Sequence, residues 1–222
     1  MIMVRHVILI GAVAIGLAWY LRVAGHEVED QVVPHYIEVV LKPSATTECS
    51  AAFFNGAQSR AVVFVPGAVF DKESWYELAG RLQGLKIASL SLDGKTPRDV
   101  QAGIAFLKGK GFDRITLAGG SMGGAAILGA LENGVDDAVS QVILLAPAGG
   151  SPLKNGRIDK LFIVAKEDAL GLYPDVRLLY EGSAEPKRFV EFEGTEHAQH
   201  LFKGDHKEAL SNLLVEFVSG RE

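Results

Sequence analysis

Residues 114–130 read RITLAGGSMGGAAILGA, and four glycines surround Ser121 in this stretch. A β-rich run precedes the serine and an apolar run with helical character follows it, so the stretch is a strand-to-helix junction rather than a linker. So tight a reversal strains the serine backbone, and Gly119 and Gly123 remove side chains that would strike the neighbouring strand and helix. The pattern predicts a nucleophile elbow, G-x-S-x-G, in which the amide of Met122 begins the helix and points at a developing oxyanion.

The rest of the chain alternates between β-rich runs and helical periodicity, which predicts an α/β fold with a mostly parallel twisted sheet and helices on both faces. The expected strands are 36–41, 50–54, 61–65, 87–92, 114–118, 142–146, 161–165 and 188–192. The expected helices are 71–82, 96–107, one beginning near residue 122, and 207–218. We expect Asp71 to cap the first helix. Thr96 and Asp99 have the spacing of a capping box for the second, with Pro97 at its first position.

Length and composition favour one catalytic-size domain. The chain has 222 residues, with 48% hydrophobic and 22% charged residues, which is ordinary for a globular protein. The single cysteine, Cys49, cannot form an intrachain disulfide or a thiolate zinc site, and we expect it to be a small hydrophobic residue of a strand. A net charge of −5 and scattered lysines argue against nucleic acid as a partner.

Residues 1–25 form an N-terminal hydrophobic segment, and residues 26–222 form the expected catalytic domain. Arg5 precedes an uncharged apolar run, 7–21, which is long for a signal peptide and short for a membrane span. The small residues 23–25 suit a signal-peptidase site, whereas an aromatic pair at the end of the run suits an interfacial anchor. A cleaved signal and a retained anchor in contact with the membrane both remain open, with a buried structural element as the third alternative. The positive amino end predicts export, either anchored and facing the periplasm or the outside, or released there.

A serine nucleophile needs a histidine base and a carboxylate that orients the histidine. The histidines that follow most of the expected strands are His197, His200 and His206. His197 lies directly beyond strand 188–192, at a carboxyl end of the sheet, and is preferred over His200, while His206 is expected on a solvated helix face. Asp168, just beyond strand 161–165, is the expected acid, with Glu167 as the alternative. The predicted triad is Ser121, Asp168 and His197.

The loop after strand 61–65 is expected to supply the second oxyanion donor. Gly67 allows close approach, and the amide of Ala68, or alternatively that of Val69, can turn inward. The side chains expected to form the substrate-binding walls are Val69, Phe70, Met122, Pro147 and Leu170. These walls are mostly apolar, which favours an acyl or alkyl group over a sugar phosphate.

The order Ser121, Asp168, His197 is the one found in α/β-hydrolases. Over 36–219 the chain resembles this superfamily, and looks most like its small, lidless esterase and dienelactone-hydrolase-like branch. The resemblance rests on VFVPGAVFDKESWYELAGRL, LAGGSMGGAA, IVAKED and EGTEHAQHL. It implies the α/β-hydrolase fold and cleavage of a small-molecule carboxylic ester or thioester through an acyl-serine, as in carboxylesterases and lysophospholipases, with no metal or organic cofactor. Only 147–160 separate two strands where many relatives insert a lid, so none is expected.

Two positions depart from the pattern of these relatives. Members often carry His-Gly where this chain has Pro66 and Gly67, and often a side chain where this chain has Gly120. EHAQH offers two histidines three residues apart, but no third metal ligand has an obvious spacing. DGKTP resembles the end of a phosphate-binding loop, but Ser89 stands where that motif needs glycine. The alternatives in function are a non-catalytic, membrane-anchored binding module on the same fold and an acyltransferase with the same triad.

Overall fold

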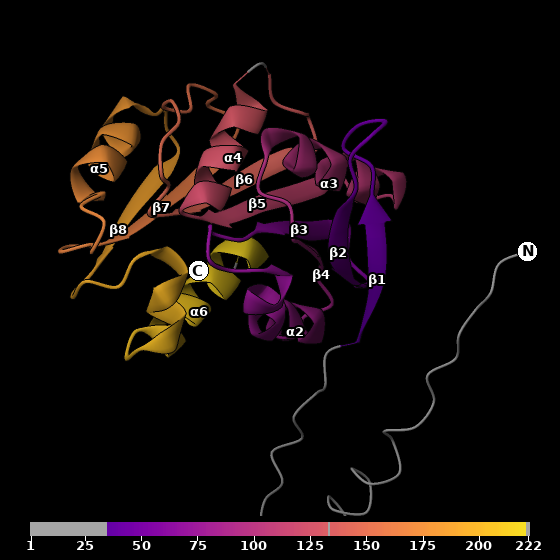
Figure 1. Ribbon diagram of the computed structural model, residues 1–222, viewed down its shortest axis with the longest axis horizontal. Coiled ribbons are helices and arrows are strands. Elements are labelled where there is room, and N and C mark those ends of the chain that lie inside the picture. Colours follow the sequence, from indigo (N-terminus) through magenta and orange to yellow (C-terminus); the bar gives the residue numbers. More distant parts are fainter. Residues whose placement is uncertain (1–34, 133, 221–222) are drawn as a thin grey trace, which may run out of the picture. The chain divides into compact units, whose positions relative to one another are not determined.

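Eight strands form one sheet in the computed structural model, which describes residues 35–132 and 134–220 (Figure 1). The strands are β1 (Tyr36–Leu41), β2 (Cys49–Phe54), β3 (Arg60–Val65), β4 (Ala88–Leu92), β5 (Arg114–Gly120), β6 (Val139–Leu145), β7 (Asp159–Ala165) and β8 (Lys187–Phe192). Their spatial order is β1-β2-β4-β3-β5-β6-β7-β8. The β1–β2 and β2–β4 pairs are antiparallel, and the pairs from β4 through β3 to β8 are parallel. The predicted mostly parallel sheet is confirmed, and the predicted strand ends differ from the observed ones by at most three residues.

Helices cover both faces of the sheet. Figure 1 shows α3, α4 and α5 on one side, and α2 and α6 on the other. Their bounds are η1 (Lys72–Trp75), α2 (Tyr76–Gly84), α3 (Pro97–Gly109), α4 (Met122–Leu131), α5 (Tyr173–Gly182), η2 (Ala198–Lys203) and α6 (Lys207–Ser219), with η1 and η2 being short 3₁₀ helices. Because both faces are covered, the central strands β3 and β4 are buried along nearly their whole length.

The predicted helix starts are partly confirmed. Thr96 and Asp99 form the expected capping box at α3, with Pro97 at its first position. The side chain of Asp71 makes no capping hydrogen bond, contrary to the prediction. The chain enters η1 there, and the carbonyl of Asp71 instead accepts hydrogen bonds from the amide and hydroxyl of Ser74.

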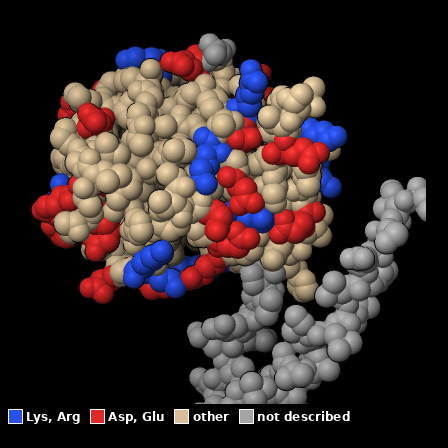
Figure 2. Space-filling model, viewed as in Figure 1, with Lys and Arg blue, Asp and Glu red and all other residues tan. Residues whose placement is uncertain are grey.

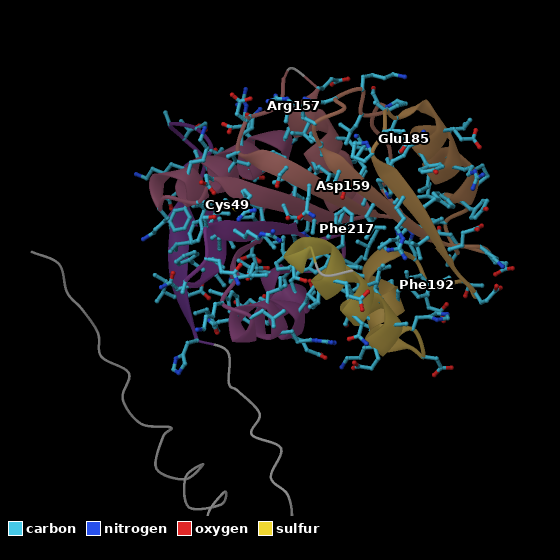
Figure 3. All side chains as sticks on the ribbon, turned by 180° about the vertical axis from the view of Figure 1, so that it is seen from behind. Cys49, Arg157, Asp159, Glu185, Phe192 and Phe217 are labelled. Atoms are coloured by element: carbon cyan, nitrogen blue, oxygen red, sulfur yellow. The ribbon has the colours of Figure 1, made fainter. Side chains whose placement is uncertain are left out.

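The predictions for Cys49 and for the N-terminal segment have different outcomes. Cys49 is a buried residue of β2, as predicted, and Figure 3 places it far along the sheet from β8. The hydrophobic segment 1–25, the boundary after it and the predicted export lie outside the described residues and stay predictions. Within 35–132 and 134–220, no helix has the length and apolar character needed to cross a membrane. On the face in Figure 2, basic residues lie scattered among acidic ones.

The parallel strands bring their carboxyl ends to one edge of the sheet. β5 lies between β3 and β6 in the middle of the sheet, and the strands β7 and β8 complete the same edge. The segments that follow β3, β5, β7 and β8 therefore meet at this edge. Residues 146–158, which join β6 to β7, contain no helix, so no lid domain is inserted there.

Candidate active site

Ser121 occupies the turn between β5 and α4. Its backbone has φ 50° and ψ −116°, a conformation that residues with a side chain rarely adopt. Two hydrogen bonds hold it there: Ser121 N donates to Leu145 O (2.9 Å), and Ala148 N donates to Ser121 O (3.0 Å). The strand, the strained turn and the helix that the motif predicts are thus all present, and they lift the serine side chain out of the sheet.

The flanking glycines are required by close backbone contacts. A Cβ atom at Gly123 would lie 2.2 Å from Val65 O, and one at Gly119 would lie 2.7 Å from the carbonyl of Gly123. Both separations are far below a normal contact, and the obstructing atoms belong to the backbone, which cannot rotate away. The elbow therefore closes only because these two positions lack side chains, as the sequence predicted.

Asp168 and His197 form a partly buried hydrogen-bonded pair. Asp168 follows β7 and His197 follows β8, and the imidazole Nδ1 lies 2.8 Å from Asp168 Oδ2. The Asp168 side chain is fully buried, and its Oδ1 accepts hydrogen bonds from Leu170 N (3.0 Å) and Leu172 N (3.4 Å). Because an ionised carboxylate only accepts, it selects the imidazole tautomer with the proton on Nδ1. The other nitrogen, Nε2, then carries a lone pair, and this buried atom has no hydrogen-bond partner.

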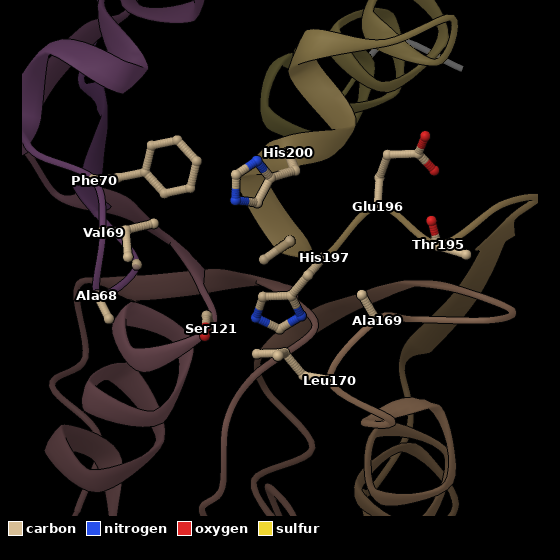
Figure 4. Close-up of a pocket in the computed structure, with 12 residues that line it drawn as sticks. Ala68, Val69, Phe70, Ser121, Ala169, Leu170, Thr195, Glu196, His197 and His200 are labelled. Atoms are coloured by element: carbon tan, nitrogen blue, oxygen red, sulfur yellow. The ribbon is translucent and has the colours of Figure 1, made fainter.

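Ser121 and His197 line the same cavity, and Figure 4 shows the imidazole ring turned towards the serine. No hydrogen bond joins the hydroxyl to the ring in this structure. Such bonds between a nucleophile and its base are often long in unliganded proteins and tighten when substrate binds. The arrangement can transfer the hydroxyl proton to Nε2, which is the first requirement for nucleophilic attack by a serine.

The cavity has a volume of about 490 Å³. Its lining residues are Gly67, Ala68, Val69, Phe70, Ser121, Ala169, Leu170, Thr195, Glu196, His197, Ala198 and His200. Val69 and Leu170, at its mouth, are 81% and 64% exposed. Pro147 does not line the cavity, contrary to the sequence analysis: it is buried and packs against the position of Gly124 in α4. Met122 is also outside the lining, although its side chain is 45% exposed.

The predicted oxyanion donors lie on the two loops that flank Ser121. Ala68 lines the cavity after β3, and Met122 opens α4. Within the described residues, neither backbone amide donates a hydrogen bond, so both are available to an oxyanion. The amide of Gly67, one residue earlier, is already engaged by Gln199 Oε1 at 2.6 Å. Gln199 was not predicted from the sequence, because no local pattern marks it as the partner of Gly67.

The alternative candidates are not joined to this pair. His200 lines the cavity and packs on Phe70, with ring centroids 5.0 Å apart, but it makes no hydrogen bond with Asp168. His206 packs on Phe192 and its Nε2 donates to Glu193 O (2.7 Å), outside the cavity. The exposed Glu167 accepts from Gly194 N at 3.2 Å. Among the described residues, no cluster of three or more His, Cys, Asp or Glu side chains could hold a metal ion.

No protein-family model and no curated protein matches this sequence. Solved structures do match. An esterase from Exiguobacterium antarcticum superposes with a TM-score of 0.69 at 16% identity, covering 82% of this chain and all of that one. An α/β serine hydrolase homologue from Coxiella burnetii has a TM-score of 0.64 at 17% identity, covering 82% and 97%. A dienelactone hydrolase from Anabaena variabilis has a TM-score of 0.63 at 19% identity, covering 83% and 96%. This protein therefore has the α/β-hydrolase fold, and the solved structures that it resembles include an esterase, a serine hydrolase homologue and a dienelactone hydrolase.

Proposed function

We propose that this protein is a serine hydrolase that cleaves carboxylic esters or thioesters through an acyl-Ser121 intermediate. The observation that carries the proposal is the Asp168–His197 hydrogen bond, which leaves a buried, unpaired Nε2 on a ring turned towards Ser121. A structural histidine at this depth would normally have a partner for each nitrogen. An unpaired acceptor facing a hydroxyl is the arrangement that general-base catalysis needs.

The proposed reaction has two halves. In the first, His197 Nε2 takes the Ser121 proton as Oγ attacks the carbonyl carbon, and the amides of Ala68 and Met122 donate to the oxyanion. Collapse of the tetrahedral intermediate breaks the bond to the alcohol or thiol, which leaves with the proton from His197. In the second half, His197 deprotonates a water that attacks the acyl carbon, and Ser121 regains its proton as the acid departs. Asp168 remains ionised and stabilises the imidazolium in both halves.

The cavity favours an ester with an apolar acyl or alkyl group. Val69, Phe70 and Leu170 give its mouth an apolar surface, and Ala169 continues this surface beside His197. Ala198 also lines the cavity. No lysine or arginine lines the cavity, so a phosphorylated substrate would have no counter-charge there. The Lys203 ammonium lies over the Phe70 ring, 5.0 Å from its centroid, without being among the lining residues.

The test combines active-site labelling with kinetics on the full chain. A fluorophosphonate probe is expected to label the wild type on Ser121 and not to label Ser121→Ala. With p-nitrophenyl esters from acetate to octanoate, His197→Ala is expected to lower kcat by about 10⁴- to 10⁶-fold, and His200→Ala by less than about tenfold. His200→Ala is the matched control, because both rings line the cavity and only His197 contacts Asp168. A folded wild type that neither reacts with the probe nor turns over any ester would support the non-catalytic binding module. Labelling without net hydrolysis, with product formed only when an acceptor alcohol is added, would support the acyltransferase.

A further inference from the structure

Gln199 is a buried amide that joins two loops of the site. It lies in η2, two residues after His197, and is only 2% exposed. Its Oε1 accepts from Gly67 N at 2.6 Å, and its Nε2 donates to Ser74 Oγ at 2.7 Å. The side chain therefore connects the segment that carries the proposed base to the loop that carries the proposed oxyanion donor Ala68.

The hydrogen bonds of Gln199 fix one orientation of its amide. The Gly67 amide can only donate, so the atom facing it must be the oxygen. The nitrogen then faces Ser74 Oγ, whose own proton is donated to Asp71 O at 2.6 Å. The network has no equivalent alternative arrangement, because the reversed amide would set its NH₂ group against the Gly67 N–H.

This network controls the peptide that carries the Ala68 amide. Glycine has no Cβ to restrict its dihedrals, so Gly67 needs external restraints to keep one conformation. Gln199 holds the Gly67 N–H, and the Gly67 carbonyl accepts from Phe70 N at 3.1 Å. That carbonyl and the Ala68 N–H belong to the same planar peptide and point in opposite directions. Fixing both sides of Gly67 therefore fixes the direction of the Ala68 N–H.

The same side chain accounts for the glycine directly before the nucleophile, which is one of the two departures from the pattern of the relatives. A Cβ at Gly120, directly before the nucleophile, would lie 3.0 Å from Gln199 Oε1, and a Cβ at Gly67 would lie 3.3 Å from the same atom. Both distances are tighter than ordinary contacts. Gln199 thus fills the space that side chains at these two positions would occupy, and the glycines leave room for its amide.

We infer that Gln199 is a positioning residue, which aims the Ala68 amide at the oxyanion and keeps that loop in register with the base. The inference rests on the proposed function. Gln199 contacts no reacting atom, so its effect should be smaller than the loss of an oxyanion donor, which costs about 10²- to 10³-fold in kcat. The Ala68 amide stabilises only the charge that develops in the transition state. When this amide is misaimed, kcat should therefore fall while KM stays nearly constant.

The main variant is Gln199→Met, which keeps the length of the side chain and removes both hydrogen bonds. We expect kcat for p-nitrophenyl butyrate to fall about 10- to 100-fold with KM within about twofold. The inhibition constant of an alkyl boronic acid, whose serine adduct carries a tetrahedral oxygen, should rise by a similar factor. Ser74→Ala is a milder second variant, because Ser74 lies at the far end of the network, and it should lower kcat about two- to fivefold.

The matched control is Ser183→Ala. Ser183 is also buried, and its Oγ accepts from Leu153 N (3.0 Å) and donates to Leu179 O (2.7 Å), outside the residues that line the cavity. With all proteins assayed well below their melting temperatures, this control should lose stability and keep its kcat. The inference is overturned if Gln199→Met or Ser74→Ala keeps the wild-type kcat, if only KM rises, or if Ser183→Ala loses as much kcat as Gln199→Met. These outcomes require an active wild type, whereas failure of the proposed function is an inactive, unlabelled wild type.

Discussion

Replacing Asp168 with asparagine should move the ring proton of His197 from Nδ1 to Nε2. The reason is that the hydrogen-bond partners of residue 168 fix the orientation of the new amide. Asp168 Oδ1 accepts from two backbone amides, those of Leu170 and Leu172. Only the amide oxygen of asparagine can take that place, which leaves its NH₂ group facing His197 Nδ1. Nδ1 must then accept, so the ring proton moves to Nε2, and Nε2 can no longer take the proton of Ser121.

The size of the effect follows from the cost of turning the amide the other way. That orientation would set the NH₂ group against two buried N–H groups and leave both unsatisfied, at about 1–3 kcal/mol each. A total of about 2–6 kcal/mol corresponds to a factor of roughly 30 to 10⁴ in the population of the productive tautomer. The loss of the negative charge beside the imidazolium adds to this. We expect kcat for Asp168→Asn to fall by about 10⁴-fold, as it does for the same change in other triads.

The assay measures kcat with p-nitrophenyl butyrate, together with nitrogen NMR of ¹⁵N-labelled histidine, which reports the tautomer directly. Glu167→Gln is the matched control, because this neighbouring carboxylate accepts only from Gly194 N at the surface, and its kcat should stay within twofold of wild type. A kcat for Asp168→Asn within tenfold of wild type would refute the reasoning. So would an Nε2 that stays unprotonated in the variant at neutral pH.

Three further outcomes are expected. Gly123→Ala places a Cβ 2.2 Å from Val65 O, so its free energy of unfolding, measured in urea, should fall by at least about 3 kcal/mol. Gly109→Ala is the control, because the new Cβ enters open space, and its free energy of unfolding should rise by up to about 1 kcal/mol. Equal effects of the two substitutions would contradict the close contact. Leu170→Ser should lower kcat/KM about tenfold for the octanoate ester and less than twofold for the acetate, since only a long acyl chain reaches the exposed Leu170; a uniform loss would argue against this acyl path. Burial lowers the pKa of Lys160 below its ordinary 10.5. Between the lowered pKa and 10.5 the unfolded chain binds more protons than the folded one, so this residue makes the free energy of unfolding rise with pH by up to about 1.4 kcal/mol per pH unit. Lys160→Met should remove that contribution, and stability curves that run parallel for the two proteins would contradict it.

The sequence predicted those parts of the fold that depend on short-range patterns. Strand β3 is apolar throughout because it is buried on both faces, and α3 carries its start signal in Thr96 and Asp99. It missed α5 altogether. It also began β6 three residues late, because Gln141 interrupts the apolar run. In the folded protein Gln141 is satisfied by Thr116 and by the carbonyl of Phe217 at the end of α6, partners that no local pattern contains.

In the site, too, the features with a short-range signal were predicted and those that depend on distant partners were not. The elbow could be predicted because its signal is local, with glycines two residues either side of the serine, although the contact that Gly123 avoids is with Val65 of the neighbouring strand β3. The choice of Asp168 and His197 followed from their places beyond β7 and β8, and the hydrogen bond between them agrees with it. Gln199 could not be predicted from spacing, because its partner Gly67 lies 132 residues away and only the packed loops bring the two together. Pro147 was misplaced because the turn after β6 directs its ring under α4.

Backbone strain supplies an argument about function that is independent of side-chain identity. Among the described residues, the non-glycine positions with positive φ are Lys86, Ser121, Ala146 and Ala198. Ser121 and Ala146 directly follow the neighbouring strands β5 and β6, where Ala148 N donates to Ser121 O, and Ala198 directly follows His197. Such conformations cost about 1–3 kcal/mol each and persist only where the surrounding structure enforces them. Three of the four meet at the carboxyl edge of the sheet, beside the hydroxyl and the imidazole. Strain in both loops that present these groups agrees with the proposed roles of Ser121 and His197, because a nucleophile and its base must meet a substrate in one geometry.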